Sequence, residues 1–150
     1  MSDKLKEALS ITGRLTITLM DEATGKVKQF LDVDNLVVTA GKEFIADCIR
    51  SEPGPDRMKE MAVGIDNTAP AVSDVELVDE VARIGLTASG TGQVITYQAT
   101  FPAGVGTGAL AEAGIFSADS PSTMLCRTTF PIVNKGAADS IAINWNLTIN

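Results

Sequence analysis

Carboxylates are the side chains of this sequence with the most evident chemical potential, and several of them lie close together. One short stretch without Lys or Arg holds five: Asp66, Asp74, Glu76, Asp79 and Glu80. Together with Asn67 they offer the hard oxygen ligands that Ca²⁺ prefers, but their spacing matches no EF-hand loop. The stretch is therefore read either as a solvated loop or as a contact surface for a basic partner.

The residue types needed for catalysis are scarce. The chain has no histidine, which is the most common general acid–base and a member of the usual catalytic triads. Usual zinc sites need more Cys and His than Cys48 and Cys126 supply. A glycosidase-type carboxylate pair must line a cleft, and the few aromatic residues suggest no sugar platform. We expect no catalytic residue, no cofactor, no metal and no enzymatic activity.

Glu112 is the charged residue whose surroundings stand out. It lies within the small and apolar run 109–116. A carboxylate buried there would need a cationic partner, and Arg127 or Arg83 is the natural candidate. Alternatively, Glu112 faces outward from a half-exposed strand. A Glu112–Arg127 pair would be structural, because no nucleophile or base accompanies it.

Composition limits the remaining classes. The net charge of −7 argues against nucleic-acid binding, which needs clustered Lys and Arg. No signal peptide or membrane-spanning run is evident, so we expect a soluble protein made in the cytoplasm and no membrane partner. Both cysteines lie in apolar patterns that favour buried free thiols, although the sequence does not decide whether they pair.

The elements that must position these side chains are mostly strands. In residues 141–149 large apolar residues alternate with Ala142, Asn144, Asn146 and Thr148, which is typical of a strand with one buried face. The other face meets solvent or a partner. The predicted core residues are Trp145, Phe130, Phe101, Tyr97, Ile143 and Leu147.

The rest of the chain completes an all-β pattern. Alternation and turn residues predict a hairpin from 14–20 and 26–31, and strands at 58–65, 94–101, 109–116 and 124–133. Residues 77–84 fit an edge strand or a helical turn. One helix is predicted at 40–50, with Thr39 as its N-cap. Turns are predicted at residues 134–136 and in a contact loop at Gly104, Gly106 and Gly108.

These elements predict the domain organisation. Many short strands with Gly- and Pro-rich turns favour a mainly β fold, an antiparallel, jelly-roll-like β-sandwich with one short helix. A chain of 150 residues is about one domain. We expect an N-terminal arm at residues 1–11 and a single sandwich at 12–150.

Several segments together resemble small β-rich virion proteins of tailed bacteriophages. The segments that carry this resemblance are residues 35–42, 61–70, 80–83, 112–116, 124–130 and 143–149. The resemblance covers about residues 35 to 150 and implies no catalytic residues. It implies a mechanical role in the virion, as a homo-oligomer bound to a shell or tail protein.

The position within the virion is inferred from general features. A short chain without repeats or a fibrous extension favours a capsid decoration or cement protein bound to the major capsid protein. The alternative is a tail-fibre or baseplate component, and a carbohydrate-binding module is a third class. The expected contacts are the carboxylate stretch, the glycine loop and the arm.

Overall fold

A computed structural model describes residues 9–118 and 121–150. Within these ranges the chain forms one helix and a succession of antiparallel strands. In order they are β1 (Ile11–Asp21), β2 (Val27–Asp34), β3 (Leu36–Val37), α1 (Thr39–Arg50), β4 (Met58–Gly64), β5 (Glu80–Gly85), β6 (Thr87–Thr91), β7 (Val94–Phe101), β8 (Gly108–Ser117), β9 (Met124–Lys135) and β10 (Asp139–Ile149).

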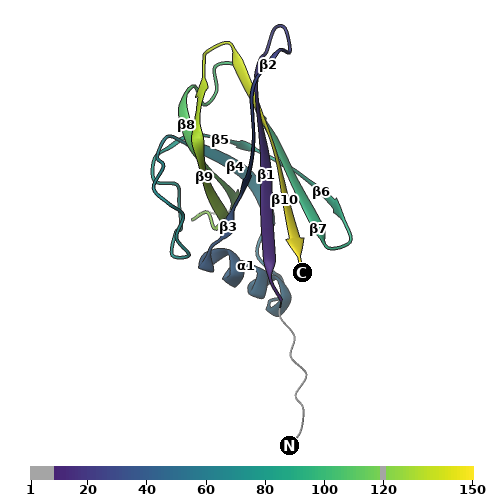
Figure 1. Cartoon of the computed structure of the whole chain (residues 1–150). Helices are drawn as coiled ribbons and strands as arrows, with labels where there is room; N and C mark the ends of the chain where they lie inside the picture. The colour runs from purple at the N-terminus through teal and green to yellow at the C-terminus, as the bar shows by residue number, and fades with distance from the viewer. Residues whose placement is uncertain (1–8, 119–120) are drawn as a thin grey trace, which may run out of the picture.

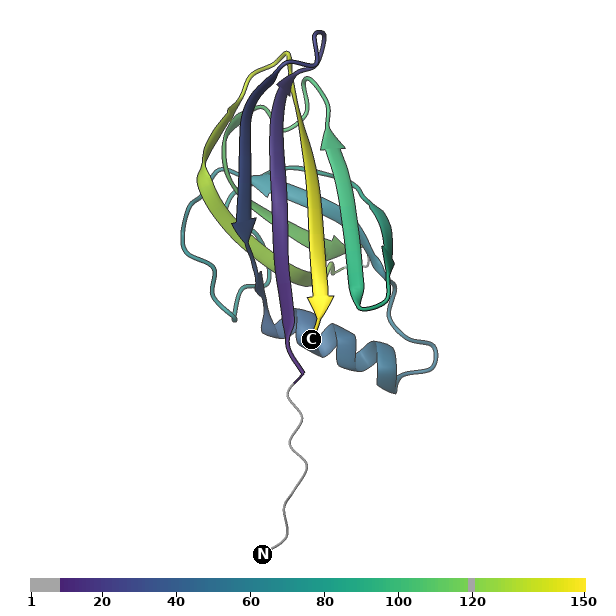
Figure 2. The same cartoon turned by 45° about the vertical axis from the view of Figure 1, so that its right-hand side comes forward.

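The strands form two five-stranded sheets, so the predicted antiparallel β-sandwich is confirmed. One sheet has the order β2-β1-β10-β7-β6 and the other β3-β9-β8-β4-β5. The sheets face each other, and α1 lies across one end of the sandwich (Figure 1). The β1–β2 hairpin projects at the opposite end (Figure 2). Asn35 lies where the chain leaves the first sheet and enters the second.

The closing strand β10 lies in the middle of its sheet. It pairs with β1 from Ile11↔Ile149 to Asp21↔Asp139, and with β7 on its other side. Its inward residues Ile143, Trp145 and Leu147 are almost fully buried. Phe101 and Phe130 are also buried in the core, whereas Tyr97 is half-buried at its edge. The alternation predicted for this strand is thus present.

The start of the helix differs from the prediction. Thr39 is the first helical residue and Val38 holds the N-cap position without a side-chain cap. The Thr39 cap is therefore wrong, because tertiary contacts replace it. The N–H of Val38 donates to the carbonyl of Leu125, and the N–H of Thr39 donates to the carbonyl of Val72.

The burial predicted for Cys48 on this helix is also wrong. Cys48 is exposed and Ile49 is 84% exposed, so a buried thiol at position 48 is wrong. The first half of α1 contacts the sheets through Gly41, Phe44 and Ile45. The last turn of the helix lies beyond these contacts. Cys126 is buried as predicted, and both cysteines are free thiols.

Several strands begin or end at other residues than the sequence predicts. Residues 77–84 divide into loop and edge strand, with β5 beginning at Glu80, and β6 follows where no strand was predicted. Strand β9 runs through the predicted turn to Lys135. Most of the predicted arm, residues 1–8, lies outside the described residues, and Ile11 belongs to β1. No helix in the described part of the chain is both long and apolar enough to span a membrane.

The end of the sandwich near the β1–β2 hairpin is held by Asp139. Lys28 Nζ donates to Asp139 Oδ1 at 2.7 Å, and the N–H of Gly136 donates to Oδ2 at 2.9 Å. The Lys28 hydrogen bond, followed by that of Gly136, lowers the pKa of Asp139. A carboxyl with a lowered folded pKa stabilises the protein above its unfolded pKa of about 3.9, and that contribution disappears as the pH falls through the folded value.

Asp139→Asn tests this linkage. We expect the variant to be less stable than the parent at pH 7, and the gap to narrow as the pH falls below about 4, because the parent carboxylate becomes protonated there. Urea unfolding of both proteins at a series of pH values measures the gap. A difference in unfolding free energy that stays constant down to low pH would show that Asp139 does not have a lowered pKa in the folded protein.

Candidate functional site: a loop held by a buried ion pair

The outer face of the sheet β3-β9-β8-β4-β5 is covered by the chain itself. Residues 65–79, which we call the β4–β5 loop, connect β4 to β5 across this face (Figure 1). Leu77 is 4% exposed and packs into a second apolar cluster, separate from the core between the sheets. The other members of that cluster are Val38, Ala62, Phe116 and Met124.

Glu112 on β8 holds the loop from below. Its side chain is fully buried, and its carboxylate accepts three backbone hydrogen bonds from the loop. Oε1 accepts from the N–H of Val78 at 2.9 Å. Oε2 accepts from the N–H groups of Asp79 at 2.9 Å and Asp66 at 3.2 Å. One side chain therefore joins both ends of the loop to the sheet.

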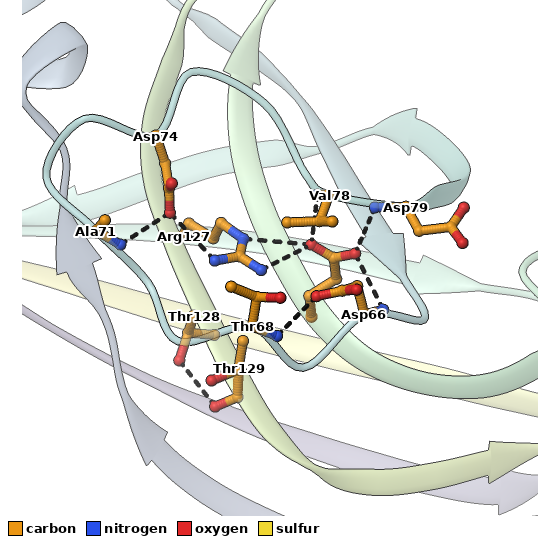
Figure 3. Close-up of polar contacts among 10 residues, drawn as sticks. Asp66, Thr68, Ala71, Asp74, Val78, Asp79, Arg127, Thr128 and Thr129 are labelled. Carbon is orange, nitrogen blue, oxygen red and sulfur yellow. Dashed lines mark hydrogen bonds and ion pairs between the residues drawn. The ribbon is translucent and has the colours of Figure 1, made fainter.

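Arg127 on β9 neutralises this carboxylate and adds a further link. It is fully buried and donates from Nε and Nη2 to Glu112 Oε1, at 3.2 and 3.1 Å. Its Nη1 donates to Asp74 Oδ2 at 3.1 Å, and the same oxygen accepts from the N–H of Ala71. Figure 3 shows the loop passing around Arg127, with Asp74 on one side and Val78 and Asp79 on the other.

The sequence around Glu112 explains why the loop can lie so close. A Cβ atom at Gly64 would lie 2.5 Å from Glu112 Oε2 and 2.4 Å from the carbonyl oxygen of Asp79. A Cβ at Gly114 would lie 3.2 Å from Leu77 Cδ2. These two glycines make room for the carboxylate and for the apolar side chain that accompany the loop.

The ion pair predicted between Glu112 and Arg127 is present, and Arg83 is not the partner. Arg83 pairs with Glu80 at 2.8 Å, and its guanidinium carbon lies 4.0 Å from the centre of the Phe116 ring. The pair is buried rather than outward-facing, so the alternative of a half-exposed charge is wrong. Pairing and complete hydrogen bonding are the conditions under which buried charges are tolerated.

The predicted carboxylate patch divides into inner and outer members. Asp74 faces Arg127, and Asp66 accepts a hydrogen bond from the N–H of Thr68 at 2.7 Å. The hydroxyl and N–H of Thr68 lower the pKa of Asp66. Glu76 and Asp79 are exposed, and neither forms an ion pair with any described residue. The predicted surface is therefore smaller than the sequence indicates.

Valines accompany these outer carboxylates. Val72, Val75 and Val78 are 53%, 60% and 54% exposed, although the loop beneath them is fixed. Sequence reasoning missed them because it weighed the charges of the stretch and not its apolar residues. Their regular spacing between the acids was the available signal. The outer side of the β4–β5 loop thus presents apolar side chains beside uncompensated negative charge.

The glycine turn lies next to the beginning of this loop. A Cβ at Gly108 would lie 3.7 Å from Ile65 Cγ2, and one at Gly106 would lie 3.3 Å from Val63 Cγ2. Gly104, Gly106 and Gly108 all have positive φ angles, which glycine adopts without strain. Both predicted contact loops therefore lie at the same end of β4.

The outward side of β10 is polar and ordered. Asn146 accepts a hydrogen bond from Thr96 at 2.7 Å, and Asn144 accepts one from Gln98 at 2.6 Å. Thr148 is partly exposed on the same face. Phe30 on β2 is 59% exposed, an aromatic side chain that the sequence alone did not single out.

Trp145 and Tyr97, the side chains that could bind a sugar, are packed within the fold. Trp145 has no exposed surface and so offers no ring face to a sugar. Tyr97 lines an apolar cavity of about 100 Å³ beneath α1, with Phe44 and Ile45, and burial raises its pKa to about 12. Among residues 9–118 and 121–150, no three Cys, Asp or Glu side chains gather in a way that could hold a metal ion.

Comparisons of the chain with protein-family models, with curated proteins and with solved structures gave no match.

Proposed function

We propose that this chain is a structural protein of a tailed-phage virion, a decoration or cement protein that binds the major capsid protein. The resemblance of residues 35–150 to small virion proteins supports the phage assignment. The observation that carries the binding role is the β4–β5 loop, which is fixed from below by Glu112 and displays Val72, Val75 and Val78 outward.

Three properties of the β4–β5 loop favour its use as a binding surface: exposed apolar side chains, a fixed conformation and negative charge. Exposed apolar patches on soluble proteins mark interaction sites. A loop that is already ordered loses little conformational entropy when it binds, so more of the contact energy remains as affinity. Glu76 and Asp79 add a negative rim, which favours a partner surface that combines apolar side chains with Lys or Arg.

A repeating shell suits such a surface. Many identical sites let weak individual contacts hold an assembly together through multivalency. A cement protein on the joints between capsid subunits would resist the outward pressure of packed DNA by this means. Our proposal therefore places the β4–β5 loop and the adjacent glycine turn against the capsid, and the protein in the virion after synthesis in the host cytoplasm.

The test uses phage particles assembled without this chain, separated into heads and tails. Purified protein is expected to bind heads in a saturable manner at hundreds of copies. Val78→Lys should reduce binding strongly, because it places a charge in the apolar surface. Val27→Lys is the matched control, since Val27 is equally exposed, at 54%, but lies at the β1–β2 hairpin.

Other outcomes of this binding experiment would change or exclude the proposal. Binding to tails at a few copies would replace the capsid assignment with the tail-fibre or baseplate one. Equal loss of binding in the Val78 and Val27 variants would exclude the loop as the contact surface. Binding to neither part of the particle would contradict the virion role.

A further inference from the structure

Three of the four sheet edges carry features that hinder pairing with another strand. Edge strand β2 carries Lys28, Asp32 and Asp34, and its end is covered where Thr128 Oγ1 donates to the carbonyl of Asp34. Edge strand β3 has two residues and runs directly into α1. Edge strand β5 carries the Glu80–Arg83 pair. Charges, shortness and coverage are the usual protections of edge strands.

The fourth edge, β6, has none of these protections. All five residues from Thr87 to Thr91 are exposed, and none is charged. The strand lies at the outer margin of its sheet (Figures 1 and 2). It belongs to a long uncharged part of the chain, because no Asp, Glu, Lys or Arg occurs from Ile84 to Ala111. In a protein of net charge −7, this neutral edge is exceptional.

The register identifies which backbone groups of β6 have no strand partner among the described residues. A two-residue turn, Gly92 and Gln93, joins Thr91 to its partner Val94. The closing pair of such a hairpin is hydrogen-bonded, and hydrogen-bonded and open pairs then alternate along an antiparallel ladder. The backbone groups of Thr87, Ser89 and Thr91 therefore face β7. Those of Ala88 and Gly90 face outward.

The side chains of β6 leave this edge accessible. Gly90 has φ 142°, and a Cβ there would lie 2.1 Å from the carbonyl oxygen of Val94, so only glycine fits. Glycine within a strand is typical of sites where another backbone approaches closely. Ala88 is small, and Ser89 lies on the outer face beside Thr96.

We propose that β6 pairs with β6 of a second copy of this chain. The two strands run antiparallel about a two-fold axis at Ser89, which places Ala88 of each copy opposite Gly90 of the other. The outward N–H and C=O groups of these two residues then satisfy one another across the interface. The two five-stranded sheets become one continuous sheet.

A second copy fits this edge better than a charged partner does. Two molecules of equal net charge repel each other, so they associate most readily where both surfaces are neutral and self-complementary. Residues 84–111 provide such a surface, whereas the β4–β5 loop is acidic. The pairing does not depend on the proposed virion function, and the two interfaces lie on different elements.

The test measures the mass of the purified protein by sedimentation across a wide range of concentration. A reversible monomer–dimer equilibrium is expected. Ala88→Pro removes an outward N–H from each copy without disturbing the β6–β7 ladder, since proline is tolerated on an edge strand when its N position faces solvent. We expect the dissociation constant to rise about tenfold or more, because two symmetric hydrogen bonds are lost.

Two lysine variants distinguish edge pairing from stacking of sheet faces. Ser89→Lys sets two like charges opposite each other at the axis and should weaken the dimer. Thr18→Lys adds the same charge to the outer face of the same sheet, on the interior strand β1, and should leave the dimer unchanged. The amide of Gly90 should exchange more slowly in the parent dimer than in the Ala88→Pro or the Ser89→Lys variant. The amide of Ala88 should likewise exchange more slowly in the parent dimer than in Ser89→Lys.

Two results would overturn the proposal. One is that the protein stays monomeric at the highest concentration reached. The other is that Thr18→Lys disrupts the dimer while Ala88→Pro and Ser89→Lys do not. Protection of the β6 amides only when a different protein binds would assign the edge to that protein instead.

Discussion

Replacement of Glu112 by alanine is expected to lower the free energy of unfolding by about 3–5 kcal/mol. The substitution leaves Arg127 buried without its principal counter-charge. It also removes the acceptor of the N–H groups of Asp66, Val78 and Asp79. Buried donors without acceptors add to the loss. Equilibrium unfolding in urea measures the change.

Two variants separate the buried pair from a general effect of removing acidic residues. Glu76→Ala removes an exposed carboxylate from the same loop and should change the stability by less than about 0.5 kcal/mol. The double variant Glu112→Leu/Arg127→Met removes both charges and should be less destabilised than the sum of its single variants, since no charge remains unpaired. A loss below about 1 kcal/mol for Glu112→Ala would contradict the role that we assign to this residue.

Trp145→Ala is expected to cost about 3–5 kcal/mol of stability, because it leaves a large cavity in the core between the sheets. Trp145 is fully buried on the central strand β10, between Leu15 on β1 and Tyr97 on β7 in the register of the sheet. Its Nε1–H has no hydrogen-bond partner among the described residues, so its contribution is packing.

The neighbouring residue provides the control for this prediction. Asn146 lies on the exposed side of the same strand, where it accepts a hydrogen bond from Thr96. Asn146→Ala should therefore change the stability by about 0.5 kcal/mol or less. Thermal or urea unfolding of the two variants compares the faces of β10 directly. Similar losses for both, or a loss below about 1 kcal/mol for Trp145→Ala, would mean that the strand faces are assigned incorrectly.

The parts of the fold that the sequence predicted are those with local signals. Alternation from Ile141 to Ile149 predicted the buried face of β10, and the turn at residues 21–25 predicted the first hairpin. Glu112 was recognised because a carboxylate in an apolar run needs a cation. These patterns are properties of a few adjacent residues, so no knowledge of the tertiary structure was required.

The misplaced features depend on contacts between distant segments. The helix needs no cap from Thr39 because the carbonyl of Val72, in the middle of the β4–β5 loop, accepts the N–H of Thr39. Cys48 is exposed because α1 extends beyond the end of the sandwich. The five small residues of β6 have no alternation, and pairing with β7 is what makes them a strand. The spacing of the outward valines is visible in the sequence, but their fixed position depends on Leu77 and Glu112, which hold the loop on the sheet.

Amide hydrogen exchange at Val78 and Asp79 in the unmodified protein measures whether the β4–β5 loop has one fixed conformation, as the proposed contact surface requires. Their N–H groups donate to the buried Glu112 carboxylate, so they should exchange about as slowly as amides of the core strand β8, such as that of Ala113. Exchange as fast as that of an unfolded chain would show that the loop opens freely. It would contradict the preformed contact surface on which the proposed function rests.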